Sequence, residues 1–118
     1  MKNNKAILEK ANASLKEGDN EGFLMHCTED TAWIFVGDMT LRGKEAVRQY
    51  MAEAYATPPK FNMELMIEEG DYVTQMGSIS LKDENGEMID YLACDVLKFR
   101  DGKIAELKAF VIRDNKHI

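Results

Sequence analysis

Residues 91–113 read Tyr-Leu-Ala-Cys-Asp-Val-Leu-Lys-Phe-Arg-Asp-Gly-Lys-Ile-Ala-Glu-Leu-Lys-Ala-Phe-Val-Ile-Arg, and this stretch decides the fold class. Its two apolar-rich runs flank Asp101-Gly102, a dipeptide that favours a tight hairpin because both residues tolerate positive φ. We therefore predict two antiparallel strands, 88–99 and 103–113. Asn85-Gly86 predicts another hairpin and adds a strand at 72–81, and alternating residues at 61–67 predict one more.

Upstream of Pro58-Pro59 the apolar residues recur at every third or fourth position, which is the spacing of one helical face. This pattern predicts helices over about residues 4–17, around residues 23–27, and from residue 44 to the prolines. A β-branched and aromatic run at 31–36 predicts one short strand between the second and third helices. Three helices followed by a four-stranded meander predict an α+β fold.

The last predicted strand separates its side chains into two sets. One set is uniformly apolar and should face the helices: Ala105, Leu107, Ala109 and Val111. The alternate set mixes charge with large apolar groups: Glu106, Lys108, Phe110 and Ile112. A mixed face of this kind is typical of a partly covered surface, and self-association is its simplest cover. We therefore expect a homodimer that forms through the convex face of the sheet.

The composition sets limits on the class of protein. The 118 residues suffice for a single domain, which we place at 1–118, and the hydrophobic share of 45% is ordinary. A net charge of −6 without a basic cluster argues against nucleic acid as a partner. No apolar stretch reaches the ~20 residues of a membrane span, and no secretory signal is visible, so we expect a cytoplasmic protein. Cys27 and Cys94 are interpreted as small buried thiols, with one disulfide as the alternative in an oxidising compartment.

Three short motifs occur in a telling order: Leu15-Lys16-Glu17-Gly18-Asp19, Leu41-Arg42-Gly43-Lys44-Glu45-Ala46-Val47 and Phe99-Arg100-Asp101-Gly102-Lys103-Ile104. From about residue 6 to residue 112 the chain resembles the SnoaL-like and ketosteroid isomerase-like branch of the nuclear transport factor 2-like superfamily. The resemblance implies a cystatin-like cone, with three helices on the concave face of a strongly curved antiparallel sheet and a pocket between them. It also implies that dimers are common. Functions in the superfamily range from isomerases, cyclases, dehydratases and epoxide hydrolases to non-catalytic transport and assembly proteins.

Asp95 is the most informative candidate, because it lies in the middle of a predicted strand among apolar neighbours. Lys98 should reach solvent, which assigns the opposite face, with Asp95, to the interior. Desolvation would raise the pKa of this carboxyl group and suit it to acid or base chemistry. By resemblance, Asp95 falls where ketosteroid isomerase keeps a protonated aspartic acid. The positions that match the isomerase's tyrosine and general base hold Ala11 and Phe35, so the cyclase branch is the least contradicted. The alternative for Asp95 is a structural carboxylate.

His26 is the second catalytic candidate, as a proton partner of Asp95 at the pocket mouth; a surface or capping role is the alternative. We place it on the second helix beside Cys27, where neighbouring side chains diverge by about 100° and make a poor nucleophilic pair. His117, near the C-terminus, is discounted. Two distant histidines and no metal-binding or nucleotide-binding motif predict neither a metal nor a cofactor.

Aromatic and flexible apolar side chains could form the wall of a pocket for a flat apolar ligand, and filling the core is the alternative for each. The residues predicted to contact the ligand are Trp33, Phe35, Tyr50, Met51, Tyr55, Met76, Tyr91, Leu97, Leu107 and Ala109. The strand at 72–81 is polar on both sides, so its sequence leaves open which set faces inward. One set is Thr74, Met76 and Ser78, and the other is Val73, Gln75 and Gly77.

The leading hypothesis is a domain that binds a small apolar molecule and acts as a cofactor-independent isomerase, cyclase or lyase. Asp95 would then be its acid or base. The alternative is a non-catalytic ligand-binding domain, or a dimeric assembly or interaction domain.

Overall fold

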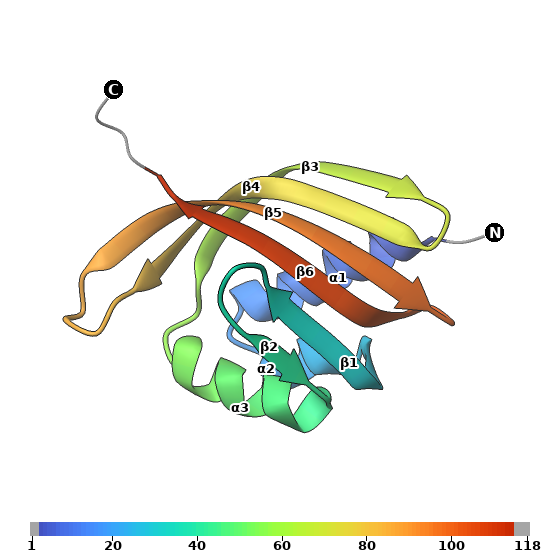
Figure 1. Ribbon diagram of the computed structural model, residues 1–118, viewed down its shortest axis with the longest axis horizontal. Coiled ribbons are helices and arrows are strands. Elements are labelled where there is room, and N and C mark those ends of the chain that lie inside the picture. The colour runs from blue at the N-terminus through green and yellow to red at the C-terminus, as the bar shows by residue number, and fades with distance from the viewer. Residues whose placement is uncertain (1–2, 115–118) are drawn as a thin grey trace.

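The computed structural model describes residues 3–114 as three helices and one six-stranded sheet (Figure 1). The helices are α1 (Asn4–Lys16), α2 (Asn20–Leu24) and α3 (Lys44–Ala54). The strands are β1 (Cys27–Phe35), β2 (Thr40–Arg42), β3 (Lys60–Glu69), β4 (Tyr72–Lys82), β5 (Met88–Arg100) and β6 (Lys103–Arg113). This arrangement confirms the predicted α+β class and the four-stranded meander. The structure also contains β2, a short strand that was not predicted from the sequence. Over the described residues, no helix is long and apolar enough to cross a membrane.

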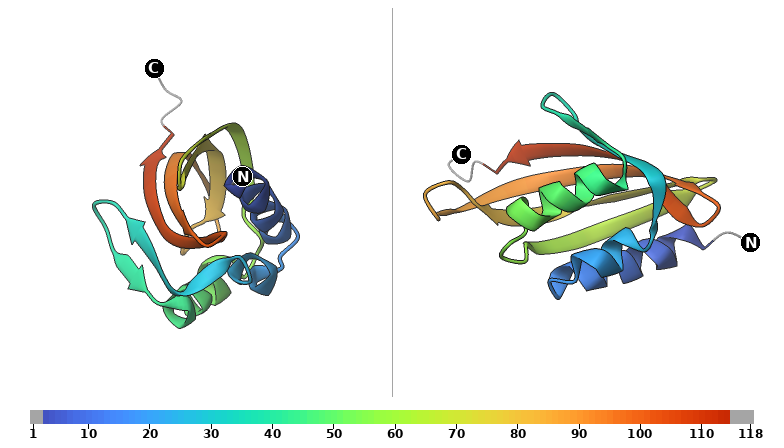
Figure 2. Two further views of the ribbon diagram at one scale, coloured as in Figure 1. Left: turned by 90° about the vertical axis from the view of Figure 1, so that its right-hand side faces the viewer. Right: turned by 90° about the horizontal axis from the view of Figure 1, so that it is seen from below.

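The sheet runs in the order β2-β1-β6-β5-β4-β3, and every neighbouring pair is antiparallel except β1 and β6. Figure 2 shows the sheet end-on, curled over the helices and open along one side. The parallel pairing places Trp33 beside Leu107 and Phe35 beside Ala109. Two aromatic residues from the first half of the chain thereby join the concave face that the last strand builds.

The turn between α1 and α2 follows the predicted logic of a helix stop and a new cap. Gly18 has a φ of 81°, which an L side chain would adopt only with strain. The Asp19 side chain then accepts a hydrogen bond from the Gly22 amide at 2.9 Å and caps α2. The prediction that Cys27 lies on this helix is wrong, because α2 ends at Leu24 and Cys27 begins β1.

Two irregularities change which residues face inward. Between Lys98 and Phe99 the β5–β6 register shifts, so Ala105 is an extra residue and Ile104 takes the buried position. The expectation that Ala105 faces the helices is therefore wrong, whereas Leu107 and Ala109 are buried as predicted. A similar shift follows Met63 in β3. It turns the side chains of Leu65 and Ile67 outward and packs Met66 against the core.

Strand β4 turns Val73, Gln75 and Gly77 inward, which settles the choice that its sequence left open. Met76 therefore lies on the convex face with half of its surface exposed. Gly77 is required where it stands, because a Cβ there would overlap the Asn62 carbonyl oxygen of β3.

The core lies between the helices and the concave face. Its largest fully buried apolar side chains come from all three helices and from β4, β5 and β6: Leu8, Leu24, Val47, Met51, Val73, Leu97 and Ile104. Helix α1 covers β3 and β4, and α3 covers β1. A cavity also remains between the helices and the concave face.

Candidate ligand cavity

A cavity of about 90 Å³ lies between the concave face of the sheet and the helices. All three helices and every strand except β2 contribute to its wall. Its lining residues are Asn12, Leu15, Phe23, Trp33, Phe35, Tyr50, Tyr55, Phe61, Met63, Gln75, Ile79, Leu81, Ala93, Asp95, Leu107, Ala109 and Val111.

One side of the cavity is a cluster of aromatic rings. Trp33 packs edge-on against Tyr50 with centroids 6.2 Å apart, and Phe35 and Tyr50 lie 5.2 Å apart. Tyr55 continues the cluster, 5.9 Å from Tyr50. Such rings give a large contact area with little loss of side-chain freedom. The Trp33 indole N–H is buried and has no hydrogen-bond partner among the described residues.

The opposite side carries one chain of polar side chains. Asn12 Nδ2 donates to Gln75 Oε1 at 2.8 Å, and Gln75 Nε2 donates to Asp95 Oδ2 at 3.0 Å. The three residues come from α1, β4 and β5. No lysine, arginine or histidine of the described chain lines the cavity, so Asp95 faces it without a cationic partner.

Burial raises the pKa of Asp95 from 3.8 to about 6, and the hydrogen bond from Gln75 offsets only part of this rise. The side chain keeps some accessible surface because it borders the cavity, yet protein surrounds it on nearly every side. Burial, followed by the charges of Tyr50 and Asp95, raises the pKa of Tyr55 far above its usual range. The pKa of Tyr50 is also raised, by burial and then by Asp38. At neutral pH the two tyrosines are therefore neutral hydroxyl donors.

The SnoaL-like domain family matches residues 8–107, which is most of the chain. The protein belongs to this family. The family and fold named from the three sequence motifs are thus confirmed.

Solved structures of similar fold agree with this assignment. An NTF2-like protein of unknown function from Burkholderia pseudomallei is 18% identical, with a TM-score of 0.81 over 97% of this chain and 92% of that one. A protein named as a SnoaL-like polyketide cyclase from Jannaschia is 16% identical, with a TM-score of 0.80 over 92% and 84%. An uncharacterised cystatin-fold protein from Novosphingobium aromaticivorans is 16% identical, with a TM-score of 0.83 over 93% and 99%. A comparison with curated protein sequences finds no significant match. At these identities the structures establish the fold alone.

The cavity is lined by Asp95 and by six of the ten residues predicted to contact the ligand: Trp33, Phe35, Tyr50, Tyr55, Leu107 and Ala109. The other four do not line it. Met51 and Leu97 are fully buried in the core, and Met76 lies on the convex face. Tyr91 shares the concave side of β5 with Ala93 but lies beyond the cavity wall, near the end of the sheet.

His26 is not near Asp95. It lies in the turn between α2 and β1, where its backbone carbonyl accepts a hydrogen bond from the Ile104 amide at 2.7 Å. Burial, with Lys10 and Lys103 nearby, lowers the pKa of its ring. Its place outside the cavity wall removes the basis for pairing it with Asp95. His117 lies outside the described residues.

Two polar residues of the cavity wall, Asn12 and Gln75, were not among the predicted site residues. Asn12 had a visible signal, because it stands in the buried stripe of α1 with Leu8, Ala11 and Leu15, where an amide must find a partner. Gln75 had none, because its strand is polar on both sides.

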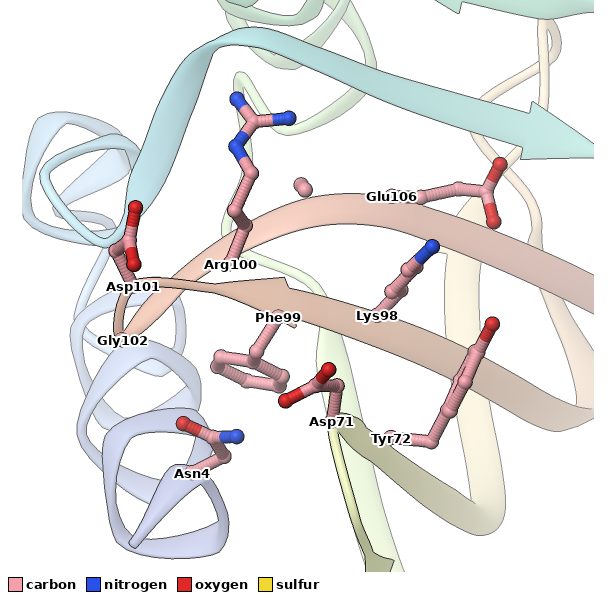
Figure 3. Close-up of a pocket in the computed structure, with 10 residues that line it drawn as sticks. Asn4, Asp71, Tyr72, Lys98, Phe99, Arg100, Asp101, Gly102 and Glu106 are labelled. Atoms are coloured by element: carbon pink, nitrogen blue, oxygen red, sulfur yellow. The ribbon is translucent and has the colours of Figure 1, made fainter. Parts of the chain in front are cut away.

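A larger hollow, of about 630 Å³, lies at the end of the sheet where the β3–β4 and β5–β6 turns lie. Figure 3 shows the residues that line it. Its cations already have partners. Arg100 reaches toward β1 and donates to Asp30 at 2.6 Å, and the Lys98 ammonium lies 6.0 Å from the centre of the Tyr72 ring. Both signs of charge line this hollow, and the Arg100–Asp30 pair is exposed to solvent. The smaller cavity, which encloses an acid of perturbed pKa, is the better candidate site. Among residues 3–114, no group of three potential metal ligands occurs.

Proposed function

We propose that this SnoaL-like protein binds a small apolar molecule in the cavity and catalyses a cofactor-independent proton transfer, as an isomerase, cyclase or lyase. The observation that carries the proposal is the position of Asp95, a carboxyl group with a pKa of about 6 in a mostly apolar wall. A carboxylate with a pKa near neutrality removes a proton more readily than an ordinary one, and its acid form returns that proton.

The proposed reaction needs two kinds of group from this chain. Asp95 accepts a proton from an activated carbon or oxygen of the substrate and returns it at another atom. Tyr55, whose hydroxyl stays protonated, lies close enough to Asp95 for the two groups to interact electrostatically. Its hydroxyl can donate a hydrogen bond to a substrate oxygen on which negative charge develops. Ala11, at the position of the isomerase's tyrosine, is fully buried, and Phe35 has no proton to exchange. The three-group steroid isomerase mechanism is therefore not proposed.

The volume of the cavity limits the ligand. About 90 Å³ holds roughly three water molecules at ~30 Å³ each, and an engineered cavity that takes up benzene measures ~150 Å³. A small ketone fits the cavity as it stands, whereas a polycyclic molecule requires the mouth to open. Leu81 lines both the cavity and a neighbouring surface hollow between residues 53–59 and the β4–β5 hairpin. Movement of these two segments would enlarge the cavity.

The test combines binding with exchange chemistry. Small ketones and phenols are screened by thermal shift, in which a ligand at ~100 times its dissociation constant adds about 2.7 kcal/mol of stability. Any ketone that binds is then incubated in D₂O, and NMR follows exchange of the protons beside its carbonyl. Asp95→Asn should bind the ketone but lose the enzyme-dependent exchange.

The matched control is Asp101→Asn. Asp101 is exposed at a hairpin turn with a φ of 54°, a conformation that asparagine tolerates equally well. Wild-type exchange rates in Asp95→Asn would contradict the catalytic proposal. Binding without exchange in any protein would identify a non-catalytic ligand-binding domain, the second candidate. Uniform absence of binding would reject the cavity as the site.

We also propose that two copies associate through the convex face. Apolar side chains from four adjacent strands are exposed there, and Leu65, Met76, Cys94 and Phe110 stand in one row across β3, β4, β5 and β6. Phe110→Asp should convert a dimer into a monomer in light scattering. Met25→Asp, at an apolar residue that is 72% exposed outside the sheet, is the control and should not. A wild-type protein that is monomeric at high concentration would reject this part of the proposal.

Localisation is the remaining part of the proposal. Cys27 and Cys94 are both unpaired, and free thiols are typical of a reducing compartment. We propose the cytoplasm. Fractionation of the native host with an antibody would test this, and recovery in a secreted fraction would contradict it.

A further inference from the structure

The polar chain beside the cavity joins three elements that are distant in sequence. Asn12 on α1 donates to Gln75 on β4, which in turn donates to Asp95 on β5, with distances of 2.8 and 3.0 Å. Gln75 is 4% exposed and Asn12 is 9% exposed, so water cannot easily replace either partner. Burying two side-chain amides and a carboxyl group costs stability unless each of them makes its hydrogen bond.

The direction of these hydrogen bonds determines where a proton can reside. The Asn12 NH₂ group can only donate, so the carbonyl oxygen of Gln75 must face it. The Gln75 NH₂ group then faces Asp95 and can only donate to Oδ2. Oδ2 is thereby held as an acceptor, which favours Oδ1 as the carrier of the proton in the neutral acid.

We propose that Gln75 and Asn12 are positioning residues for Asp95. Gln75 fixes one carboxyl oxygen, keeps the exchangeable proton on the other, and stabilises the ionised form; Asn12 locks the Gln75 amide in the orientation that does so. The proposal rests on the proposed function, since it assumes that Asp95 is the group that exchanges protons with a ligand.

The surroundings of Asp95 strengthen the effect of Gln75 on its protonation. The other titratable groups in the described cavity wall are Tyr50 and Tyr55, which stay neutral. Helix α1 contributes Asn12 and Leu15 to the wall, and β4 contributes Gln75, Ile79 and Leu81. Apart from Asp95 itself, the other strands contribute only uncharged side chains. Over residues 3–114, no cationic side chain lines the cavity to compete with the Gln75 amide for the carboxylate. Among the described residues, Gln75 is the side chain that donates to the Asp95 carboxyl group, so this hydrogen bond has a large effect on the proton affinity of that group.

The test is a pH titration of Asp95 followed by the NMR shift of its ¹³C-labelled carboxyl carbon, assigned with Asp95→Asn. Gln75→Met keeps an unbranched side chain of similar length without the donor. It should move the midpoint of the titration upward by about one pH unit, because a lost hydrogen bond to the ionised form favours the acid. Asn12→Ala should move the midpoint in the same direction by about half as much, because Gln75 can then turn.

The matched control is Thr74→Val. Thr74 is the neighbour of Gln75 in β4 and also bonds to Asp95, but its hydroxyl donates to the backbone carbonyl at 2.9 Å. This variant should lose stability and leave the midpoint unchanged. An unmoved midpoint in folded Gln75→Met would overturn the proposal, as would an equal shift in Thr74→Val. Should Gln75→Met not fold, Asn12→Ala decides in the same way.

The outcome is separable from that of the proposed function, because the titration needs no ligand. If the titration midpoints move as expected but Asp95→Asn keeps full exchange activity, the positioning roles of Gln75 and Asn12 are supported and Asp95 is rejected as the catalytic group. If the midpoints do not move but Asp95→Asn loses the exchange activity, Asp95 is supported as the catalytic group and the positioning roles of Gln75 and Asn12 are rejected.

Discussion

Replacement of Asp95 by asparagine should make the protein more stable, and more so as the pH rises. The folded pKa of Asp95 is about 6, against 3.8 when the chain is unfolded. Between these values the native state binds more protons than the unfolded state, so the stability that this group contributes falls as the pH rises. A shift of about two units corresponds to about 3 kcal/mol, at ~1.4 kcal/mol per unit, once the pH exceeds the folded pKa. This figure is an upper limit, because the Asp95 side chain borders the cavity and is not fully buried.

Asparagine avoids this cost because it has no charge and its carbonyl can still accept from Gln75. At about pH 7.5 the variant should exceed the wild type by about 2–3 kcal/mol, and at about pH 4 the two should agree within about 0.5 kcal/mol. With an unfolding entropy of ~2.1 cal/mol/K per residue, 118 residues translate the larger gap into about 10 °C.

Urea unfolding of both proteins across this pH range measures the gap directly. The pH dependence is the decisive quantity, since effects of the substitution on packing are the same at every pH. A gap that stays constant from about pH 4 to pH 7.5 would refute the reasoning, because Asp95 would then titrate alike in both states. A gap of the opposite sign at high pH would mean that an unrecognised cation stabilises the carboxylate.

Three further predictions concern the frame around the site. Gly77→Ala should destabilise the protein by about 3 kcal/mol or prevent folding, because the new methyl group overlaps the Asn62 carbonyl of β3. Urea unfolding measures this loss of stability, and a near-neutral result would contradict the close approach of β3 and β4. Asp19→Ala should cost about 1 kcal/mol by removing the cap of α2, whereas Asp19→Asn should retain most of it. Cys27 should resist iodoacetamide in the native protein at about pH 8, because burial raises the pKa of its thiol to about 11, and should react on unfolding. Mass spectrometry locates the label, and rapid native labelling of Cys27 would show that the base of β1 opens.

The sequence predicted the fold well where local chemistry is decisive. The hairpin at Asp101-Gly102, with positive φ at both residues, and the helix stop at Gly18 occur as expected, because few backbone conformations suit these residues. The strands on either side of Asn85-Gly86 also form a hairpin, but the predicted turn is wrong, because only Gly86 has a positive φ and the Asp83 amide donates to the Glu87 carbonyl across a longer loop. Errors arose where one inserted residue changes the phase of a strand. The shifts beside Lys98 and Met63 leave no mark in composition or alternation, so Ala105 was assigned to the wrong face.

The wall of the candidate site could be predicted only in part, for a related physical reason. Asp95 could be found because an acid among apolar residues on one strand is conspicuous. Its partners Asn12 and Gln75 lie 83 and 20 positions away along the chain, and only the packing of α1 across β4 brings them together. Met76 was assigned to the cavity because its type suits an apolar wall, but side-chain type does not determine the face of a strand.

The energetics of Asp95 favour a functional role over a structural one. A structural residue at this position needs only to accept the hydrogen bond from Gln75, and asparagine would do so without a charge. Aspartate adds a cost of up to about 3 kcal/mol at neutral pH, which no cation in the cavity wall offsets. That cost is a large fraction of the stability of a small domain, ~5–15 kcal/mol. Local violations of folding rules of this size concentrate at functional sites, where the perturbed group does chemistry that a relaxed one would not. The gain in stability expected for Asp95→Asn therefore measures how much the carboxyl group destabilises this fold. Loss of proton exchange in the same variant would show the function that the destabilisation supports.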